Sequence, residues 1–258
     1  MTRIIAVVNQ KGGVAKTTSC INIGAGLARR NKRVLLVDLD PQANLTYSLG
    51  INGHELNNTI VEVLEDKVNA RDSLYKVNNY YVIPSKLDLA TLERIISSKT
   101  IGGEKVLKKK MQDIIQYFDY ILLDCPPSAS ILVYNALAFA NEVFIPVQCE
   151  YLSLHGLVKI TSMIDEVKED LNTNLKISGI IPTMYQSISG LNQEVLKTLR
   201  ESYKELVFNT PIRRTVALAD SQAQNKDIFL SNMNCNGALD YWALCDEIVK
   251  QERTMTNE

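Results

Sequence analysis

The stretch that decides the fold is Lys11-Gly12-Gly13-Val14-Ala15-Lys16-Thr17-Thr18, which directly follows the apolar run Ile4–Val8. A short, continuous apolar run is typical of a strand that is buried on both faces. After the glycine-rich turn, a helix is predicted that runs to about Arg29. A glycine-rich turn between a strand and a helix presents backbone N–H groups at the helix N-terminus, where they can bind a phosphate. The stretch therefore predicts a phosphate-binding loop after the first strand.

The loop matches a variant of the nucleotide-binding pattern. The general pattern G-x-x-x-x-G-K-[ST] is not met, because Gln10 and Ala15 occupy its two glycine positions. The match is to K-G-G-x-x-K-T, in which Lys11 is an additional lysine. Ala15 brings a Cβ that crowds the loop if the backbone there needs a positive φ. We expect the phosphates to be bound by Gly12, Gly13, Val14, Ala15, Lys16, Thr17 and Thr18.

Further apolar runs alternate with stretches of helical spacing. The runs are Val34–Leu39, Tyr81–Ile83, Tyr120–Leu123, Val143–Val147, Ile177–Ile181 and a short one at Val207–Phe208. Apolar residues at 157–171 and 191–199 recur with the period of one helix face. Alternation of this kind predicts an α/β fold: a single-domain, mostly parallel twisted sheet with helices on both faces, P-loop NTPase-like, over 1–258. We expect a surface helix and loop at 52–75, and a frayed tail from about residue 252.

Acidic residues end two of the predicted strands. Asp38 and Asp40 close the run that begins at Val34, and Asp124 closes the run that begins at Tyr120. Parallel sheets place ligands at the carboxyl ends of their strands. A lone acidic residue there is more often a helix cap. Two acidic strand ends beside a phosphate loop instead predict Mg²⁺-nucleotide chemistry.

Composition excludes several classes of protein. Lys and Arg number 28 against 29 Asp and Glu, so the net charge of −1 excludes a globally basic nucleic-acid binder but not a local basic patch. The five cysteines contain no Cys-x-x-Cys pair and the chain has two histidines, which argues against a disulfide framework or a zinc site. We find no signal peptide and no apolar run of membrane-spanning length, and expect a cytoplasmic protein.

The motifs together resemble the ParA/Soj branch of the ParA/MinD ATPases, the deviant Walker A family. The resemblance covers Arg3 to about Ile248 and rests on four segments: the lysine-containing loop, Val37–Asn44, Asp124–Ser128 and Pro146–Tyr151. A looser similarity extends over Pro211–Asp220. The resemblance implies a homodimer in which two chains enclose two ATP molecules.

The resemblance also implies a role for each site residue. Lys11 would cross to the phosphates of the partner chain, as an arginine finger does, while Lys16 would hold the phosphates of its own chain. Thr17 would bind Mg²⁺ directly and Asp124 through water, while Asp38 would support the loop or lie in the second shell of the metal. Asp40 would orient or activate the attacking water. Thr183, Met184 and Pro211 are placed near the adenine.

Members of this family bind DNA without sequence preference when ATP is bound, through Lys and Arg side chains that neutralise phosphates. The candidates here are Arg213 and Arg214, with Lys197, Arg200 and Lys204 on the preceding helix. The alternative is a solvated helix face with pairs such as Lys197–Glu201. The segment 185–190 lacks the arginine that relatives often use for DNA contact, which shifts that role to Arg213 and Arg214.

The implied function is an ATPase that is slow alone and stimulated by a ParB-like or other adaptor. It would segregate plasmid or chromosome DNA, or position cargo on the nucleoid, and be cytoplasmic and nucleoid-associated. A MinD-like membrane-associated ATPase is the main alternative. That branch ends in a basic amphipathic helix, for which residues 250–258 offer little apolar surface, so we expect no membrane partner. An iron–sulfur carrier and an operon repressor are further alternatives.

Overall fold

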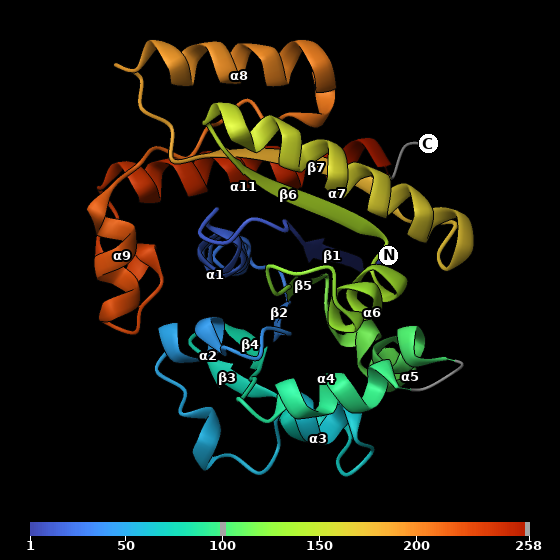
Figure 1. Ribbon diagram of the computed structural model, residues 1–258. Coiled ribbons are helices and arrows are strands. Elements are labelled where there is room, and N and C mark those ends of the chain that lie inside the picture. The colour runs from blue at the N-terminus through green and yellow to red at the C-terminus, as the bar shows by residue number, and fades with distance from the viewer. Residues whose placement is uncertain (99–101, 256–258) are drawn as a thin grey trace.

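A seven-stranded sheet with the order β3-β4-β2-β5-β1-β6-β7 forms the centre of the computed structural model (Figure 1), which describes residues 1–98 and 102–255. Strand β3 pairs antiparallel with β4, and the other pairs between the described strands are parallel. The strands are β1 (Arg3–Val7), β2 (Val34–Asp38), β3 (Tyr75–Val77), β4 (Tyr80–Ile83), β5 (Tyr120–Asp124), β6 (Glu142–Gln148) and β7 (Lys176–Thr183). The predicted α/β fold with a mostly parallel sheet is confirmed.

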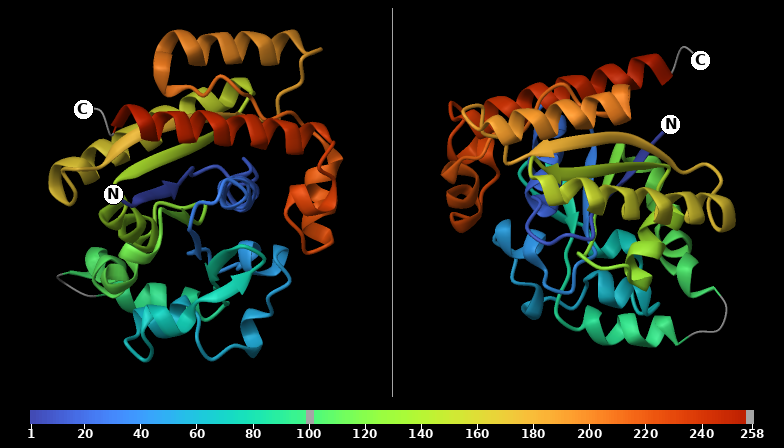
Figure 2. Two further views of the ribbon diagram at one scale, coloured as in Figure 1. Left: turned by 180° about the vertical axis from the view of Figure 1, so that it is seen from behind. Right: turned by 45° about the horizontal axis from the view of Figure 1, so that its top comes forward.

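Helices cover both faces of this sheet, as Figures 1 and 2 show. The α-helices are α1 (Lys16–Ala28), α2 (Asn44–Ser48), α3 (Ile60–Leu64), α4 (Leu89–Ser97), α5 (Val106–Met111), α6 (Ile131–Phe139), α7 (Tyr151–Asp170), α8 (Gly190–Tyr203), α9 (Val216–Ala223), α10 (Ile228–Ser231) and α11 (Asn236–Met255). Short 3-10 helices lie at Gly53–Glu55, Ala70–Ser73, Gly103–Lys105, Gln112–Tyr117 and Lys204–Leu206. No helix among the described residues is both long and apolar enough to cross a bilayer.

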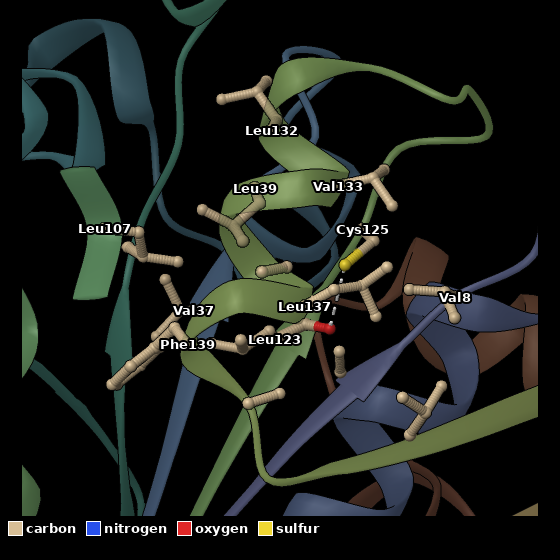
Figure 3. Packing of buried hydrophobic residues seen from close by; sticks show 14 of the residues in the cluster. Val8, Val37, Leu39, Leu107, Leu123, Cys125, Leu132, Val133, Leu137 and Phe139 are labelled. Carbon is tan, nitrogen blue, oxygen red and sulfur yellow. Dashed lines mark hydrogen bonds between the residues drawn. The ribbon is translucent and has the colours of Figure 1, made fainter. Parts of the chain in front are cut away.

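The strand residues alternate between two hydrophobic cores, because successive side chains point to opposite faces of a sheet. In β1, Ile4 and Ala6 belong to the core that contains residues of α3 to α8, and Ile5 and Val7 to the core that contains residues of α1, α10 and α11. Figure 3 shows part of the first core, where Leu132 and Leu137 of α6 pack above the strands. Burial on both faces explains why these strands read as continuous apolar runs.

The register of the central strands brings the acidic strand ends together. Asp124 at the end of β5 lies opposite Asp38 in β2 and opposite Val7 in β1. The phosphate loop follows β1, so it begins beside Asp124, with Asp38 one strand further along the sheet. The convergence predicted from the sequence is therefore present at the carboxyl end of the sheet.

Three local features differ from the sequence-based expectations. Val207 makes only an isolated parallel bridge to Ile180, and no strand forms at 207–208. Strand β3 was not expected; it enters β4 through a turn with Asn78 at φ 52°, a conformation that asparagine tolerates. Helix α3 is not a surface helix, because Ile60 and Val63 are fully buried.

Helix α11 ends at Met255, within the stretch that the sequence predicts to fray from about residue 252. Near this end the Glu252 carboxylate forms an ion pair of 2.8 Å with Lys32. Residues 256–258 lie outside the described part of the chain.

Candidate nucleotide site

The loop between β1 and α1 has the backbone of an anion-binding turn. Gly13 has φ 73°, and Ala15, the residue before α1, has φ 69°. Both values lie in the left-handed region, which glycine adopts at little cost and alanine does not. Helix α1 begins at Lys16, and the first N–H groups of a helix have no partner within it. The loop therefore has a positive φ at Ala15, which is the condition under which we expect the Ala15 Cβ to crowd the loop.

Lys16 lies beneath the loop with 7% of its surface exposed. Its ammonium donates a hydrogen bond to the backbone oxygen of Lys11 at 3.3 Å. Burial lowers the pKa of Lys16, and the nearby carboxylates of Asp124 and Asp40 oppose this shift. A buried ammonium close to the helix N-terminus can bind phosphate oxygens of a nucleotide in the loop.

Thr17 and Asp124 form a pair of oxygen donors next to Lys16. The Thr17 hydroxyl donates a hydrogen bond of 2.7 Å to Asp124 Oδ2. Asp124 is fully buried, and its Oδ1 has no hydrogen-bond partner among the described residues. Burial raises the pKa of Asp124, and the neighbouring Asp38 raises it further. Hard oxygen donors with an unsatisfied carboxylate oxygen fit Mg²⁺, which binds through one or two carboxylates, waters and phosphates.

Asp38 and Asp40 occupy the same strand end but differ in their surroundings. Asp38 Oδ2 accepts hydrogen bonds from the Thr46 amide at 2.9 Å and the Thr46 hydroxyl at 2.7 Å, and its Oδ1 accepts one from the Asp40 amide at 3.1 Å. Burial raises the pKa of Asp38 to about 7. All the hydrogen bonds of Asp38 in the described structure hold the loop after β2, in keeping with the first of its two predicted roles. Asp40 accepts a hydrogen bond from Gln42 and is 7% exposed.

The loop borders a hollow of about 330 Å³, and the fully buried Asp38 and Asp124 are not among the residues that line it. Of the predicted nucleotide contacts, Gly12, Gly13, Ala15, Lys16, Thr17, Thr18, Asp40 and Met184 line it. Val14 and Thr183 lie behind the wall, where the Thr183 hydroxyl donates to the Val14 oxygen at 3.2 Å, and Pro211 is not among the lining residues. Asn44 and Pro127, which lie in two of the segments that carry the resemblance, also line the hollow, as do Ser48 and Gln222, to which the sequence did not point. Gln222 of α9 donates a hydrogen bond to the Thr18 hydroxyl at 3.2 Å.

Lys11 lies outside this hollow. Its ammonium donates hydrogen bonds to Gln148 Oε1 at 2.7 Å and to Glu150 Oε2 at 3.0 Å. Its side chain is 40% exposed and does not line the wall around Lys16. The chain therefore places one of its two loop lysines in the hollow and the other beside it.

The basic residues expected to contact DNA lie around α8 and the segment after it. Lys197 and Arg200 line an open hollow of about 410 Å³ together with Tyr185 and Gln193. The Lys197 ammonium lies 3.8 Å from a Glu201 carboxylate oxygen, and Arg200 donates to the backbone oxygen of Asn209. The other candidates, Lys204, Arg213 and Arg214, follow α8, and both Lys204 and Arg214 are exposed.

Arg213 differs from its neighbours because a carboxylate already neutralises it. The pair with Asp240 of α11 has a shortest distance of 2.6 Å, and Asp240 is 8% exposed at its side chain. A hydrogen bond and an ion pair to Asp240 raise the pKa of Arg213. The five basic residues therefore differ in how available they are to a DNA phosphate.

A family model and several named proteins match most of this chain. A family model described as an AAA domain matches residues 2–177. The chromosome-partitioning ATPase Soj of Treponema pallidum is 41% identical over 256 residues, which are 98% of this chain and 99% of that protein. The sporulation initiation inhibitor protein Soj of Bacillus subtilis is 40% identical over 250 residues, 96% of this chain and 98% of that one.

A solved structure shares both the fold and much of the sequence. Cobyrinic acid a,c-diamide synthase from Mycobacterium smegmatis, with bound ATP analogue and magnesium, superposes with a TM-score of 0.86. It is 35% identical, and the match covers 98% of this chain and 96% of that one. Because the Soj proteins are 40–41% identical and match nearly end to end, this chain belongs to the ParA/Soj family of partition ATPases.

Proposed function

We propose that this chain is an ATP-driven partition ATPase that forms a homodimer on ATP, binds DNA without sequence preference and moves DNA or other cargo over the nucleoid. The observation that supports this proposal most is the different placement of the two loop lysines. Lys16 lines the hollow, and Lys11 lies outside it. A site with one cation of its own and a second lysine at its edge suits assembly from two chains.

The residues around the hollow suit hydrolysis of ATP. Lys16 would bind phosphate oxygens, and the amides at the start of α1 would add the helix N-terminus to that binding. Mg²⁺ held by Thr17 and, through water, by Asp124 would neutralise charge on the phosphates. Asp40 faces the same hollow and would accept a hydrogen bond from the attacking water, orienting it for in-line attack.

Binding of DNA would use the exposed basic residues around α8. Lys197 and Arg200 border one hollow, and Tyr185, which also lines it, exchanges backbone hydrogen bonds with the segment that carries Arg214. Exposed cations suit a phosphate backbone, and each neutralised phosphate makes the affinity more sensitive to salt. Since Asp240 compensates Arg213, we assign DNA contact chiefly to Arg214, Lys197, Arg200 and Lys204.

Nucleoid association would follow from this DNA binding, and an adaptor of the ParB type would stimulate hydrolysis. A MinD-like membrane role is less well supported. The apolar residues Tyr241, Leu244 and Ile248 of α11 are fully buried in the core that contains α1, so these residues are not available to a bilayer.

The test is binding to random-sequence duplex DNA with ATP, with ADP and without nucleotide, over a salt series. An Asp40→Ala variant would hold ATP without turnover, and sedimentation would report its oligomeric state. We expect dimerisation and salt-sensitive DNA binding with ATP only. A dimer that does not bind DNA but binds anionic vesicles would overturn the DNA-binding proposal and support the MinD-like alternative. A chain that stays monomeric with ATP would refute the proposal altogether.

A further inference from the structure

The side-chain amide of Gln148, at the end of β6, connects Lys11 with the nucleotide site. Its Nε2 donates to the Gly13 backbone oxygen at 3.0 Å and to Met184 Sδ at 3.0 Å. Its Oε1 accepts from Lys11 Nζ at 2.7 Å. Because an ammonium can only donate and a carbonyl oxygen can only accept, these partners permit one orientation of the amide. Gln148 is 8% exposed, so water competes little for these bonds.

Glu150 adds an ion pair to the contacts of Lys11. Its Oε2 lies 3.0 Å from Lys11 Nζ, and 59% of the Glu150 side chain is exposed. Glu150 is the residue before α7, yet its side chain makes no capping hydrogen bond to that helix. The carboxylate is therefore committed to Lys11 rather than to the helix start.

The turn that carries both side chains is fixed from two sides. The Cys149 amide donates to the Thr183 oxygen of β7 at 3.1 Å, and Asn192 Nδ2 of α8 donates to the Cys149 oxygen at 2.8 Å. Within the turn, the Glu150 amide donates to the Gln148 oxygen at 2.8 Å. Lys11 thus meets a pre-formed pair of acceptors on its own chain.

We propose that Gln148 and Glu150 form a clamp that retains Lys11 on its own chain, and that release from this clamp sets part of the cost of ATP-dependent dimerisation. The inference rests on the proposed function, in which Lys11 acts on the phosphates of the partner chain. One ammonium cannot bind both places, so every dimer must open two clamps. Gln148 is a positioning residue in this scheme, because it acts through Lys11.

The same amide brings the clamp close to the nucleotide. Gly13 and Met184, which hold the Nε2 group of Gln148, both line the hollow. Two of the three partners of this amide are therefore wall residues of the nucleotide site. A ligand that shifts either wall residue disturbs the amide that holds Lys11.

The first test compares dimerisation of the unmodified chain with that of Glu150→Gln, by sedimentation equilibrium with a non-hydrolysable ATP analogue. Glu166→Gln on the exposed side of α7 removes the same charge from a residue that has no ion pair among the described residues, and is the matched control. An exposed ion pair is worth about 1.4- to 5-fold in an equilibrium constant. Because two clamps open per dimer, the dimer dissociation constant should fall by about 2- to 25-fold in Glu150→Gln only. A rise in this constant would mean that Glu150 stabilises the dimer, and would overturn the proposal.

A second test needs no dimer. Brief acetylation of the nucleotide-free chain, read by mass spectrometry, reports how available the Lys11 amine is. We expect Lys11 to react about two- to fivefold faster in Glu150→Gln and in Gln148→Leu than in Glu166→Gln, with unchanged reactivity of the exposed Lys197. Equal rates at Lys11 would refute the clamp. If Lys11 reacts faster but the analogue gives no dimer in any variant, the proposed function fails while the clamp stands.

Discussion

The guanidinium of Arg213 binds both carboxylate oxygens of Asp240, which lies 27 residues later on α11. The Arg213 backbone amide donates to the same carboxylate at 2.9 Å. One acidic side chain thus fixes the segment after α8 and neutralises the arginine that it carries. Arg214, the next residue, is exposed and turns its backbone amide to the Tyr185 oxygen at 3.0 Å. Adjacent arginines therefore have different environments, and their substitution should have different effects.

Arg214→Ala should weaken DNA binding and leave stability almost unchanged. If each chain of a dimer loses one phosphate contact, the slope of log affinity against log salt should shrink by about 2. Arg213→Ala should instead lower the free energy of unfolding by about 1–2 kcal/mol, because it leaves the buried Asp240 carboxylate without its charged partner. A salt series of DNA affinity and a urea titration of each variant measure the two effects. If Arg213→Ala instead reduced the salt slope and left the urea midpoint unchanged, Arg213 would be a DNA contact and not a residue that stabilises the fold.

The sequence predicted the sheet and most of the nucleotide site, since both depend on local patterns. The apolar runs gave the strands, and the loop from Lys11 to Thr18 is contiguous in the chain. Asp38 and Asp124 could be placed together because parallel strands end at one edge. The bonds of Gln148 could not be predicted, because they join residues from three separate segments.

Other contacts also depended on tertiary packing. Gln222 reaches Thr18 over 204 residues of sequence, and nothing in its own neighbourhood indicates a site. Arg213 was expected at the surface because its partner lies on a helix that no local pattern connects to it. Spacing predicts which residues share an element, whereas ion pairs between elements depend on how those elements pack.

Asp40→Ala should abolish hydrolysis and preserve nucleotide binding. Asp40 lines the hollow but makes no hydrogen bond to the loop residues that would hold phosphates. Loss of a group that orients or activates water costs about 10²- to 10⁴-fold in rate. Single-turnover release of phosphate from ATP measures the rate, and binding of a fluorescent ATP analogue checks affinity. Wild-type turnover in this variant would exclude Asp40 from the reaction.

Ala15→Gly should be tolerated, and Ala15→Val should not. A left-handed φ of 69° is strained for alanine, and glycine relieves this strain while adding freedom to the unfolded chain. These opposing effects should leave the free energy of unfolding within about 1 kcal/mol of the parent. A β-branched residue has a larger penalty at positive φ and should distort the loop. The melting temperature and the ATP affinity of the two variants test this expectation. Equal ATP affinities would show that the loop tolerates a β-branched side chain at residue 15 as well as it tolerates glycine.

Glu142→Gln should lower the free energy of unfolding at neutral pH. It should also make that free energy depend less on pH in acid. Arg3 and Glu142 are buried, with a hydrogen bond of 2.7 Å from Arg3 Nε. Burial alone would raise the pKa of Glu142, but the hydrogen bond and charge of Arg3 outweigh it and lower that pKa. A lowered pKa means that this stabilisation is present above the unfolded value of about 4.3 and disappears as the pH falls through the folded value. Breaking a buried pair costs about 3–5 kcal/mol, so urea midpoints at pH 7 should separate the variants and those in strong acid should converge. Midpoints that stay equally far apart at both pH values would contradict this account.

Thr17→Val should raise the magnesium concentration that ATP hydrolysis requires, whereas Thr17→Ser should leave it unchanged. The Thr17 hydroxyl donates to Asp124 Oδ2, and Asp124 Oδ1 is buried without a hydrogen-bond partner among the described residues. Valine keeps the shape of threonine but removes the hydroxyl, so it costs both a metal ligand and the orientation of Asp124. Serine retains both, which makes it the matched control. Titration of magnesium against ATP turnover should show an apparent affinity about 10- to 100-fold weaker for Thr17→Val. Removing the metal with a chelator should stop turnover in the parent and in Thr17→Ser. If Thr17→Val titrated like the parent, the metal would be held without the Thr17 hydroxyl, and Asp124 alone would have to supply the protein side of the site.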